Sequence, residues 1–196
     1  MPLRLMTQMD AGEAAVVLAR ARQGDEEAFR VLVDVHARAA FRLAYRLMRD
    51  ERDAEDVVQE SFIRAYRRLH GFESRANFGT WLHRIVVNCA LDALETRERH
   101  RARRDESADG LPETIVFDGP SPEQAARSAE IARRVDDSMR LLTAQERVAF
   151  TLRHHEGRSI DDIGQALGIQ RSAAKHAVFR AVRKLRAALA PLRRQV

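Results

Sequence analysis

The sequence predicts an all-α protein in which two small helical domains are joined by a flexible acidic linker. Apolar residues recur at helical spacing on both sides of residues 105–123, which hold six acidic residues, three prolines and no Lys or Arg. A short helix, a turn at Gly168 and a long helix follow near the C-terminus. We expect a disordered N-terminus over residues 1–15 and a first domain over residues 16–104. The linker then covers residues 105–124, and the second domain covers residues 125–196.

The first domain opens with helical periodicity that continues to about residue 50. Gly24 and Asp25 indicate the end of one helix and the N-cap of the next. The apolar residues beyond them are assigned to the core and to no function: Phe29, Leu32, Val33, Leu43, Leu47 and Met48.

A further helix is predicted to begin near Asp53, where acidic residues fill the first turn and suit the positive end of the helix dipole. One stripe has buried spacing and consists of Val58, Phe62, Ala65 and Leu69. The other face changes from acidic to basic along the helix through Glu55, Asp56, Gln59, Glu60, Ile63, Arg64, Arg67 and Arg68. From the residues alone, a solvated face with a Glu60–Arg64 pair explains this pattern at least as well as a binding surface.

The stretch HGFESRAN interrupts the periodicity, and Phe72 within it has no evident core to join. The following helix has apolar residues at core spacing, but Ile85, Asn88 and Asp92 share one of its faces. A polar pair on that face is also typical of an ordinary helix surface. Five arginines then fall within residues 97–104, which favours either phosphate contacts or a solvated helix end.

A short apolar run, Ile115 to Phe117, lies within the linker. A single strand would have no partner there, so we expect an extended segment that docks on another surface.

The second domain has the signature of a helix-turn-helix. Residues 143–146, TAQE, match a capping box and predict a helix that ends near Gly157. A short helix, a turn around Gly168 and a long helix follow, and the long helix buries Ala174, Val178, Ala181 and Leu185. Its outward residues suit a DNA major groove and are Arg171, Lys175, His176, Phe179, Arg180 and Arg183. A generic basic helix is the weaker alternative, because a short helix and a turn precede it.

Charge and composition narrow the function classes. Residues 124–196 carry 15 Lys and Arg against 7 Asp and Glu, an electrostatic pattern typical of nucleic-acid binding. A single cysteine, Cys89, excludes an internal disulfide and a multi-cysteine metal site within one chain. No apolar run suggests a membrane span or a secretory signal, so we expect a cytosolic protein. No cofactor is predicted.

An enzyme is disfavoured because His154, His155 and Glu156 lack the spacing of a helical metal-hydrolase motif. No nucleophile and base arrangement is evident either.

Four segments of the chain together resemble the extracytoplasmic-function class of bacterial sigma factors. They are QGDEEAF, DAEDVVQESFIRAYRRL, FGTWLHRIVVN and LTAQERVAFTLRHHEGRSIDDIGQALGI. These are the RNA polymerase subunits that recognise promoters. The resemblance covers roughly residues 14–98 and 125–190, in matching order and spacing, and corresponds to the family's regions two and four. It implies a transcription initiation factor whose partners are promoter DNA and core polymerase, through the beta-prime clamp coiled coil and the beta flap.

The resemblance also implies roles for particular residues. The polymerase-docking positions would be Asp53, Glu55, Asp56, Gln59 and Glu60. The pocket for a base flipped from the minus-ten element would comprise Arg64, Phe72, Ile85, Asn88 and Asp92, with Arg64 neutralising the backbone and a base stacking on the aromatic ring. The positions for the minus-thirty-five element include Lys175, His176, Phe179 and Arg180.

Two departures from the family pattern leave the promoter sequence open. Where many relatives carry a Gly-Thr pair and a Lys-Ser-Arg run, this chain has Ser172, Ala173, Lys175, His176 and Ala177. Asp92 stands where an amide would read more bases. We hypothesise that, as an acceptor, it favours an exocyclic amine such as that of cytosine.

Two further expectations complete the sequence interpretation. The family resemblance implies an inhibitory anti-sigma partner, often membrane-bound, that engages both domains. The competing hypothesis is a regulator that binds DNA through its helix-turn-helix without polymerase, and tight sequence-specific gel shifts by the chain alone would favour it.

Overall fold

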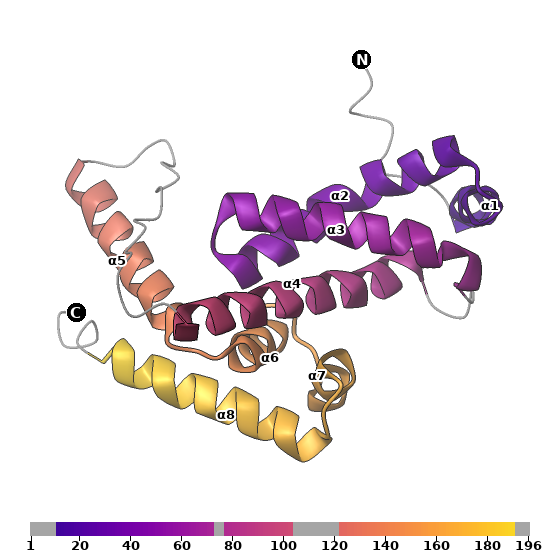
Figure 1. Cartoon of the computed structure of the whole chain (residues 1–196). Coiled ribbons are helices and arrows are strands. Elements are labelled where there is room, and N and C mark those ends of the chain that lie inside the picture. The colour runs from indigo at the N-terminus through magenta and orange to yellow at the C-terminus, as the bar shows by residue number, and fades with distance from the viewer. Residues whose placement is uncertain (1–10, 73–76, 104–121, 191–196) are drawn as a thin grey trace. The chain divides into compact units, whose positions relative to one another are not determined.

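The computed structural model describes residues 11–72, 77–103 and 122–190 (Figure 1). Its elements are α1 (Ala11–Arg22), α2 (Glu26–Met48), α3 (Glu51–Arg68), η1 (Leu69–Gly71), α4 (Phe78–Arg103), α5 (Pro122–Arg140), α6 (Ala144–His154), α7 (Ile160–Leu167) and α8 (Arg171–Ala188). None of the described residues forms a strand, which confirms the all-α prediction. The chain divides into two compact units, Met1–Ala93 and Leu94–Val196.

Helix ends in the first unit lie where local sequence signals place them. Gly24 follows α1 with a positive φ of 91°, and the side chain of Asp25 caps α2 by accepting from the Ala28 amide at 3.0 Å. Asp50 caps α3 in the same way, so this helix begins two residues before the predicted start at Asp53. These caps satisfy amides that the first helical turn leaves without intrahelical partners.

The core of the first unit forms where α2 packs against α3. Leu32, Leu43, Leu47 and Met48 of α2 are buried as predicted, whereas Phe29 and Val33 are half-buried. The predicted stripe of α3 is wrong at Val58, which is also only half-buried. The buried positions of α3 are Ala54, Val57, Ser61, Phe62 and Ala65, and Leu69 continues them.

Phe72 joins an aromatic cluster at the beginning of α4. Its ring lies 4.9 Å from that of Trp81 and 6.2 Å from that of Phe78, measured between centroids. Only 4% of Phe72 is exposed, so the expectation that it has no core to join is wrong. Across the unit, His36 of α2 contacts the Phe78 ring, which fixes the first turns of α4 against α2.

In the second unit, α8 packs against α5, α6 and α7. Thr143 and Ser159 form capping boxes that begin α6 and α7, as the TAQE motif predicted for α6. Gly168 ends α7 with a φ of 64°, and the chain then turns into α8. At Gly164 a Cβ atom would lie 2.9 Å from the carbonyl oxygen of Ile169, so the turn requires glycine there. The helix-turn-helix prediction is confirmed.

The buried face of α8 consists of Ala174, Ala177, Ala181 and Leu185, whereas Val178, predicted to be buried, is half-buried. Small residues let α8 approach its neighbours closely. Met139 and Leu142 complete this core beside Ala181 and Leu185, and Phe150 packs against them.

The predicted segment Ile115 to Phe117 and most of the predicted linker lie outside the described residues. α5 begins at Pro122, within the last residues assigned to the linker, and proline suits the first position of a helix because its missing amide hydrogen would have no intrahelical partner. Among the described helices, none has both the length and the apolar character needed to cross a bilayer.

Candidate functional site

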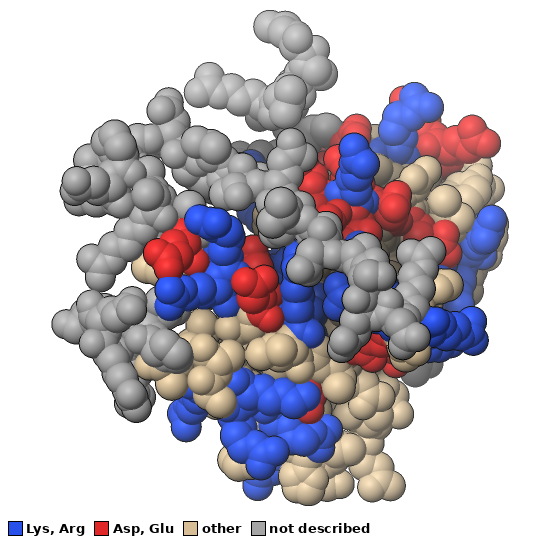
Figure 2. All heavy atoms as spheres, turned by 60° about the vertical axis from the view of Figure 1, so that its left-hand side comes forward, with Lys and Arg blue, Asp and Glu red and all other residues tan. Residues whose placement is uncertain are grey.

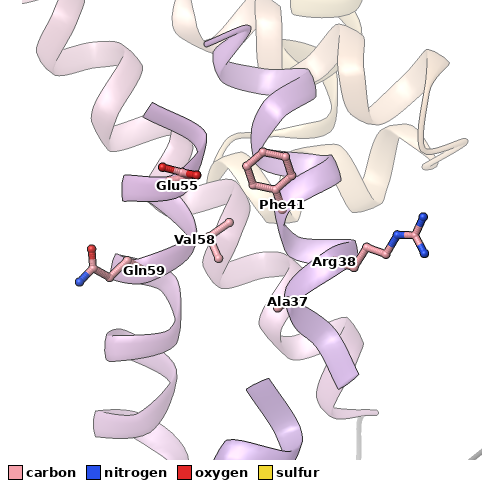
Figure 3. Close-up of a pocket in the computed structure, with 6 residues that line it drawn as sticks. All are labelled: Ala37, Arg38, Phe41, Glu55, Val58 and Gln59. Atoms are coloured by element: carbon pink, nitrogen blue, oxygen red, sulfur yellow. The ribbon is translucent and has the colours of Figure 1, made fainter. Parts of the chain in front are cut away.

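An open groove of about 520 Å³ lies between α2 and α3 (Figure 3). Its apolar centre is formed by Ala37 and Phe41 of α2 and Val58 of α3, while Glu55 and Gln59 line the α3 side. Figure 3 shows Val58 between the two helices and Gln59 directed away from α2. The groove therefore combines an apolar centre with an acidic rim at Glu55 on α3 and a cation, Arg38, on α2.

The five predicted docking residues occupy one stretch of α3, but they differ in exposure. Glu55, Asp56 and Gln59 are exposed, whereas Asp53 and Glu60 are half-buried. The sequence interpretation missed the α2 side of the groove, Ala37, Arg38 and Phe41. Their spacing of one, three and four residues places them on one helix face, but only the pairing of α2 with α3 shows which residues face them.

A cluster of charges connects α3 with α4. The Nε atom of Arg64 donates to Glu60 Oε1 at 2.7 Å, and its Nη1 atom donates to Asp92 Oδ2 at 2.8 Å. These hydrogen bonds, first to Asp92 and then to Glu60, raise the pKa of Arg64. The predicted Glu60–Arg64 pair is thus present, and Asp92 is bound to the same guanidinium.

The other predicted pocket residues differ in exposure. Asn88 is exposed one turn before Asp92, whereas Ile85 and Phe72 are buried. A base could stack on the Phe72 ring only if that ring left its packing against Trp81 and Phe78. Cys89 is buried nearby, and its burial raises the pKa of its thiol. The structure thus brings together Arg64, Asp92 and Asn88 at the surface.

The outer face of α8 carries the predicted minus-thirty-five residues. All six are exposed, and Phe179 shows 64% of its surface. Figure 2 shows Lys and Arg side chains gathered at the bottom of the view, the level at which α8 lies in Figure 1. An exposed aromatic side chain among cations on the second helix of a helix-turn-helix fits a DNA major groove.

Two of these six residues already have protein partners. Arg171 Nη1 donates to Asp161 Oδ2 at 2.7 Å, and both side chains are exposed. Arg180 Nε donates to Glu146 Oε1 at 2.9 Å, and the Glu146 side chain is only 3% exposed. Arg180 is therefore held against α6 as well as lying on the outer face.

Glu146 is a buried anion shared by several donors. Its Oε2 atom accepts from Lys184 Nζ at 2.7 Å and from the Thr143 amide at 3.1 Å, in addition to the bond from Arg180. Burial by itself would raise the pKa of Glu146, but the bonds from Lys184, the Thr143 amide and Arg180 outweigh it and lower the pKa. One buried carboxylate thus joins α6 to α8.

The predicted arginine-rich end of α4 is exposed at each of its described arginines, Arg97, Arg99, Arg101 and Arg103. Arg104 lies outside the described residues.

In the part of the chain that the structure describes, no group of three His, Cys, Asp or Glu side chains could hold a metal ion.

Comparison with known proteins gives the same two-part division. Residues 32–100 match the family Sigma-70 region 2, and residues 129–185 match Sigma-70, region 4. The chain is 34% identical over 180 residues to RNA polymerase sigma-H factor of Pseudomonas aeruginosa, covering 90% of this chain and 93% of that protein. It is 31% identical over 175 residues to ECF RNA polymerase sigma factor SigW of Bacillus subtilis, covering 87% and 94%.

Solved structures agree with this assignment. CnrH, solved in complex with the cytosolic domain of CnrY, is 28% identical, with a TM-score of 0.59 and coverage of 90% of this chain and 96% of that one. RpoE of Bartonella quintana, solved with the anti-sigma factor NepR, shares the fold at 20% identity and a TM-score of 0.54, with coverage of 91% and 94%. The chain belongs to the extracytoplasmic-function class of RNA polymerase sigma factors, which bind core polymerase and direct it to specific promoters to initiate transcription.

Proposed function

We propose that this sigma factor docks on core polymerase through the α2/α3 groove and its acidic rim, and reads promoter DNA through two other surfaces. The observation that supports separate polymerase-binding and DNA-binding surfaces is that the groove side of α3 and the outer face of α8 expose side chains of opposite charge. The exposed groove residues of α3 are acidic or neutral, whereas α8, the second helix of the helix-turn-helix, has a basic exposed face.

The groove supports docking because apolar and charged side chains stand side by side. Val58 and Phe41 offer apolar area, and Glu55 with Asp56 supplies charge that selects a basic partner surface. We propose that the polymerase clamp coiled coil occupies this groove. Asp53 and Glu60 are the half-buried ends of the same docking stretch.

The two DNA surfaces are proposed to read different promoter elements. The minus-ten surface comprises Arg64, Asn88 and Asp92 of α3 and α4, together with the buried residues Ile85 and Phe72. The minus-thirty-five surface consists of Lys175, His176, Phe179 and Arg183 of α8, together with Arg171 and Arg180, which are also bound to carboxylates of the protein. On the minus-thirty-five surface, the exposed cations Lys175 and Arg183 would release counterions from DNA phosphates on binding.

Regulation is proposed to follow the pattern that the family resemblance implies. CnrH was solved bound to a second protein, the cytosolic domain of CnrY. We propose that an anti-sigma partner binds this chain as well and prevents docking on polymerase. The factor would then act in the cytoplasm, where core polymerase and promoter DNA meet.

The docking proposal is tested by reversing the charge of the rim. The double variant Glu55→Lys and Asp56→Lys should bind core polymerase at least about ten-fold more weakly, because like charges would then face each other. Glu27→Lys is the matched control, since Glu27 is an exposed acid at the N-terminal end of α2, outside the groove. Titration of fluorescently labelled factor with core polymerase measures both. Equal affinity of wild type and the double variant would refute docking at this groove.

A further inference from the structure

Arg64 is held on two sides, and this constrains what it can do at the proposed minus-ten surface. Glu60 accepts from its Nε atom and Asp92 accepts from its Nη1 atom, at 2.7 and 2.8 Å. The Nη2 atom makes no hydrogen bond to the residues that the structure describes. The Arg64 side chain is 31% exposed, and Nη2 is the guanidinium nitrogen that neither Glu60 nor Asp92 engages.

The charges around Arg64 argue against a simple phosphate contact. One guanidinium faces two carboxylates, so the three groups together carry a net charge of −1. A residue that neutralises a DNA phosphate must present uncompensated positive charge, which is the source of counterion release. A phosphate that reached this guanidinium would also approach the carboxylates of Glu60 and Asp92. A neutral hydrogen-bond acceptor on a base edge would not suffer this repulsion.

Two fixed bonds also orient the guanidinium plane. The Glu60 bond comes from the same helix one turn away, and the Asp92 bond comes from α4, 28 residues further along the chain. Because the guanidinium is rigid and planar, bonds at Nε and Nη1 fix the direction of the Nη2 hydrogens. Less side-chain entropy is then lost when those hydrogens meet a base.

We propose that Arg64 reads an acceptor-bearing base edge of the minus-ten strand through Nη2, and that Glu60 and Asp92 are positioning residues that hold its guanidinium. In this assignment Asp92 does not read an exocyclic amine itself. The proposal rests on the proposed function, because it needs the minus-ten strand to lie over this surface of α3 and α4.

The test compares holoenzymes reconstituted from core polymerase and full-length variants. Each holoenzyme selects from a library of promoter fragments in which the minus-ten strand is unpaired and randomised, and the selected pools are sequenced. Affinity for the fragment preferred by wild type is then measured between 50 and 200 mM salt, a range over which phosphate contacts change affinity strongly.

For Arg64→Ala we expect discrimination at one minus-ten position to fall at least about five-fold, while the slope of log affinity against log salt stays unchanged. Arg64→Lys keeps the charge but not the planar fork, and should lose the same discrimination. Arg67→Ala removes an equal charge from an exposed site on the same helix and should leave the base profile intact. A fall in the Arg64→Ala slope by about 0.7, with an unchanged base profile, would overturn the proposal in favour of a phosphate contact.

The positioning role of Asp92 has its own readout. Asp92→Ala should weaken discrimination at the position that Arg64→Ala affects, and the double variant should be no worse than Arg64→Ala alone, because both act through one guanidinium. If Asp92→Ala instead changes the preference at a position that Arg64→Ala leaves intact, Asp92 reads a base by itself and the inference is wrong. A wild-type holoenzyme that enriches no sequence would refute the proposed function instead.

Discussion

Replacing Glu146 with Gln should destabilise the second unit, Leu94–Val196, without unfolding the first. Glu146 accepts from Arg180, Lys184 and the Thr143 amide, and its side chain is 3% exposed. Glutamine has nearly the same volume and can keep the bond from the Thr143 amide. It lacks the negative charge that strengthens the bonds to both cations.

The magnitude follows from those two bonds. A hydrogen bond to a charged group contributes about 1.5–3 kcal/mol and a neutral one about 0.5–1.5 kcal/mol, so two weakened bonds cost about 2 kcal/mol in all. Arg180 and Lys184 remain partly exposed and can recover hydration, which keeps the cost below that of an ion left buried. For a unit of this size, such a loss lowers the melting temperature by about 8–16 °C.

The assay uses the single tryptophan of the chain. Trp81 lies in the first unit, so its fluorescence during urea unfolding follows that unit alone, whereas far-UV circular dichroism follows the helices of both. Glu146→Gln should shift the dichroism transition and leave the Trp81 transition in place. The control is Glu130→Gln, which breaks an exposed ion pair with Arg134 on α5 and should change the free energy of unfolding by less than about 0.5 kcal/mol. Equal transitions for Glu146→Gln and wild type would refute the bridging role.

The pH dependence of this effect has a definite sign. The folded pKa of Glu146 lies below its ordinary value of 4.5, because the bonds from Lys184, the Thr143 amide and Arg180 outweigh the opposing effect of burial. Its ionised form therefore stabilises the fold above pH 4.5, and this contribution is lost as the pH falls through the lower folded value. The difference in stability between wild type and Glu146→Gln should accordingly shrink below about pH 4.5, as measured by urea unfolding at several pH values. A difference that grows on acidification would contradict the lowered pKa.

Four other substitutions test the surfaces and the turn. Lys175→Ala should reduce the slope of log promoter affinity against log salt by about 0.9 and leave stability unchanged. Arg180→Ala should instead lower the free energy of unfolding by about 1–2 kcal/mol. Identical behaviour of the two variants in both assays would refute this difference between them. Gly164→Ala should destabilise the helix-turn-helix by more than 1 kcal/mol in urea unfolding, because its Cβ atom would crowd the Ile169 carbonyl oxygen. Val58→Glu should weaken binding to core polymerase at least about ten-fold in a labelled-factor titration, since it places a charge in the apolar centre of the groove.

Local patterns predicted much of this fold because the signals that specify it are local. Capping residues and the left-handed Gly168 mark the helix-turn-helix within a few positions. The outer face of α8 follows from helical periodicity alone, since every residue assigned to it is exposed. These features depend on neighbours three or four residues away.

Features that depend on distant residues were missed. The groove forms because Phe41 of α2 faces Val58 of α3. Periodicity predicts Val58 in the core, because helical spacing cannot distinguish a fully buried position from one at the edge of the buried stripe. Sequence periodicity gives Phe72 no core to join, because its partners Phe78 and Trp81 lie beyond an interruption of the pattern. Helical spacing likewise cannot reveal the bonds that commit Arg64 and Arg180 to partners 28 and 34 residues away.

The same limit applies to the assignment of function. The sequence alone assigns the six outward residues of α8 the same role in DNA binding. In the structure, Arg180 is bound to a buried carboxylate, whereas Lys175 and Arg183 make no hydrogen bond to any described residue. The family resemblance predicts which surfaces bind DNA. The contacts in the structure then show which residues of those surfaces are also bound to other parts of the protein.

Run-off transcription with purified core polymerase decides whether this chain directs the enzyme to promoters through the α2/α3 groove. The full chain is mixed with core enzyme and a library of promoter fragments, and the transcripts are sequenced. We expect transcripts from a subset of fragments that share two sequence elements. Output should be lost in the double variant Glu55→Lys and Asp56→Lys and kept in Glu27→Lys. Transcripts from no fragment, or equal output from wild type and the double variant, would contradict this expectation.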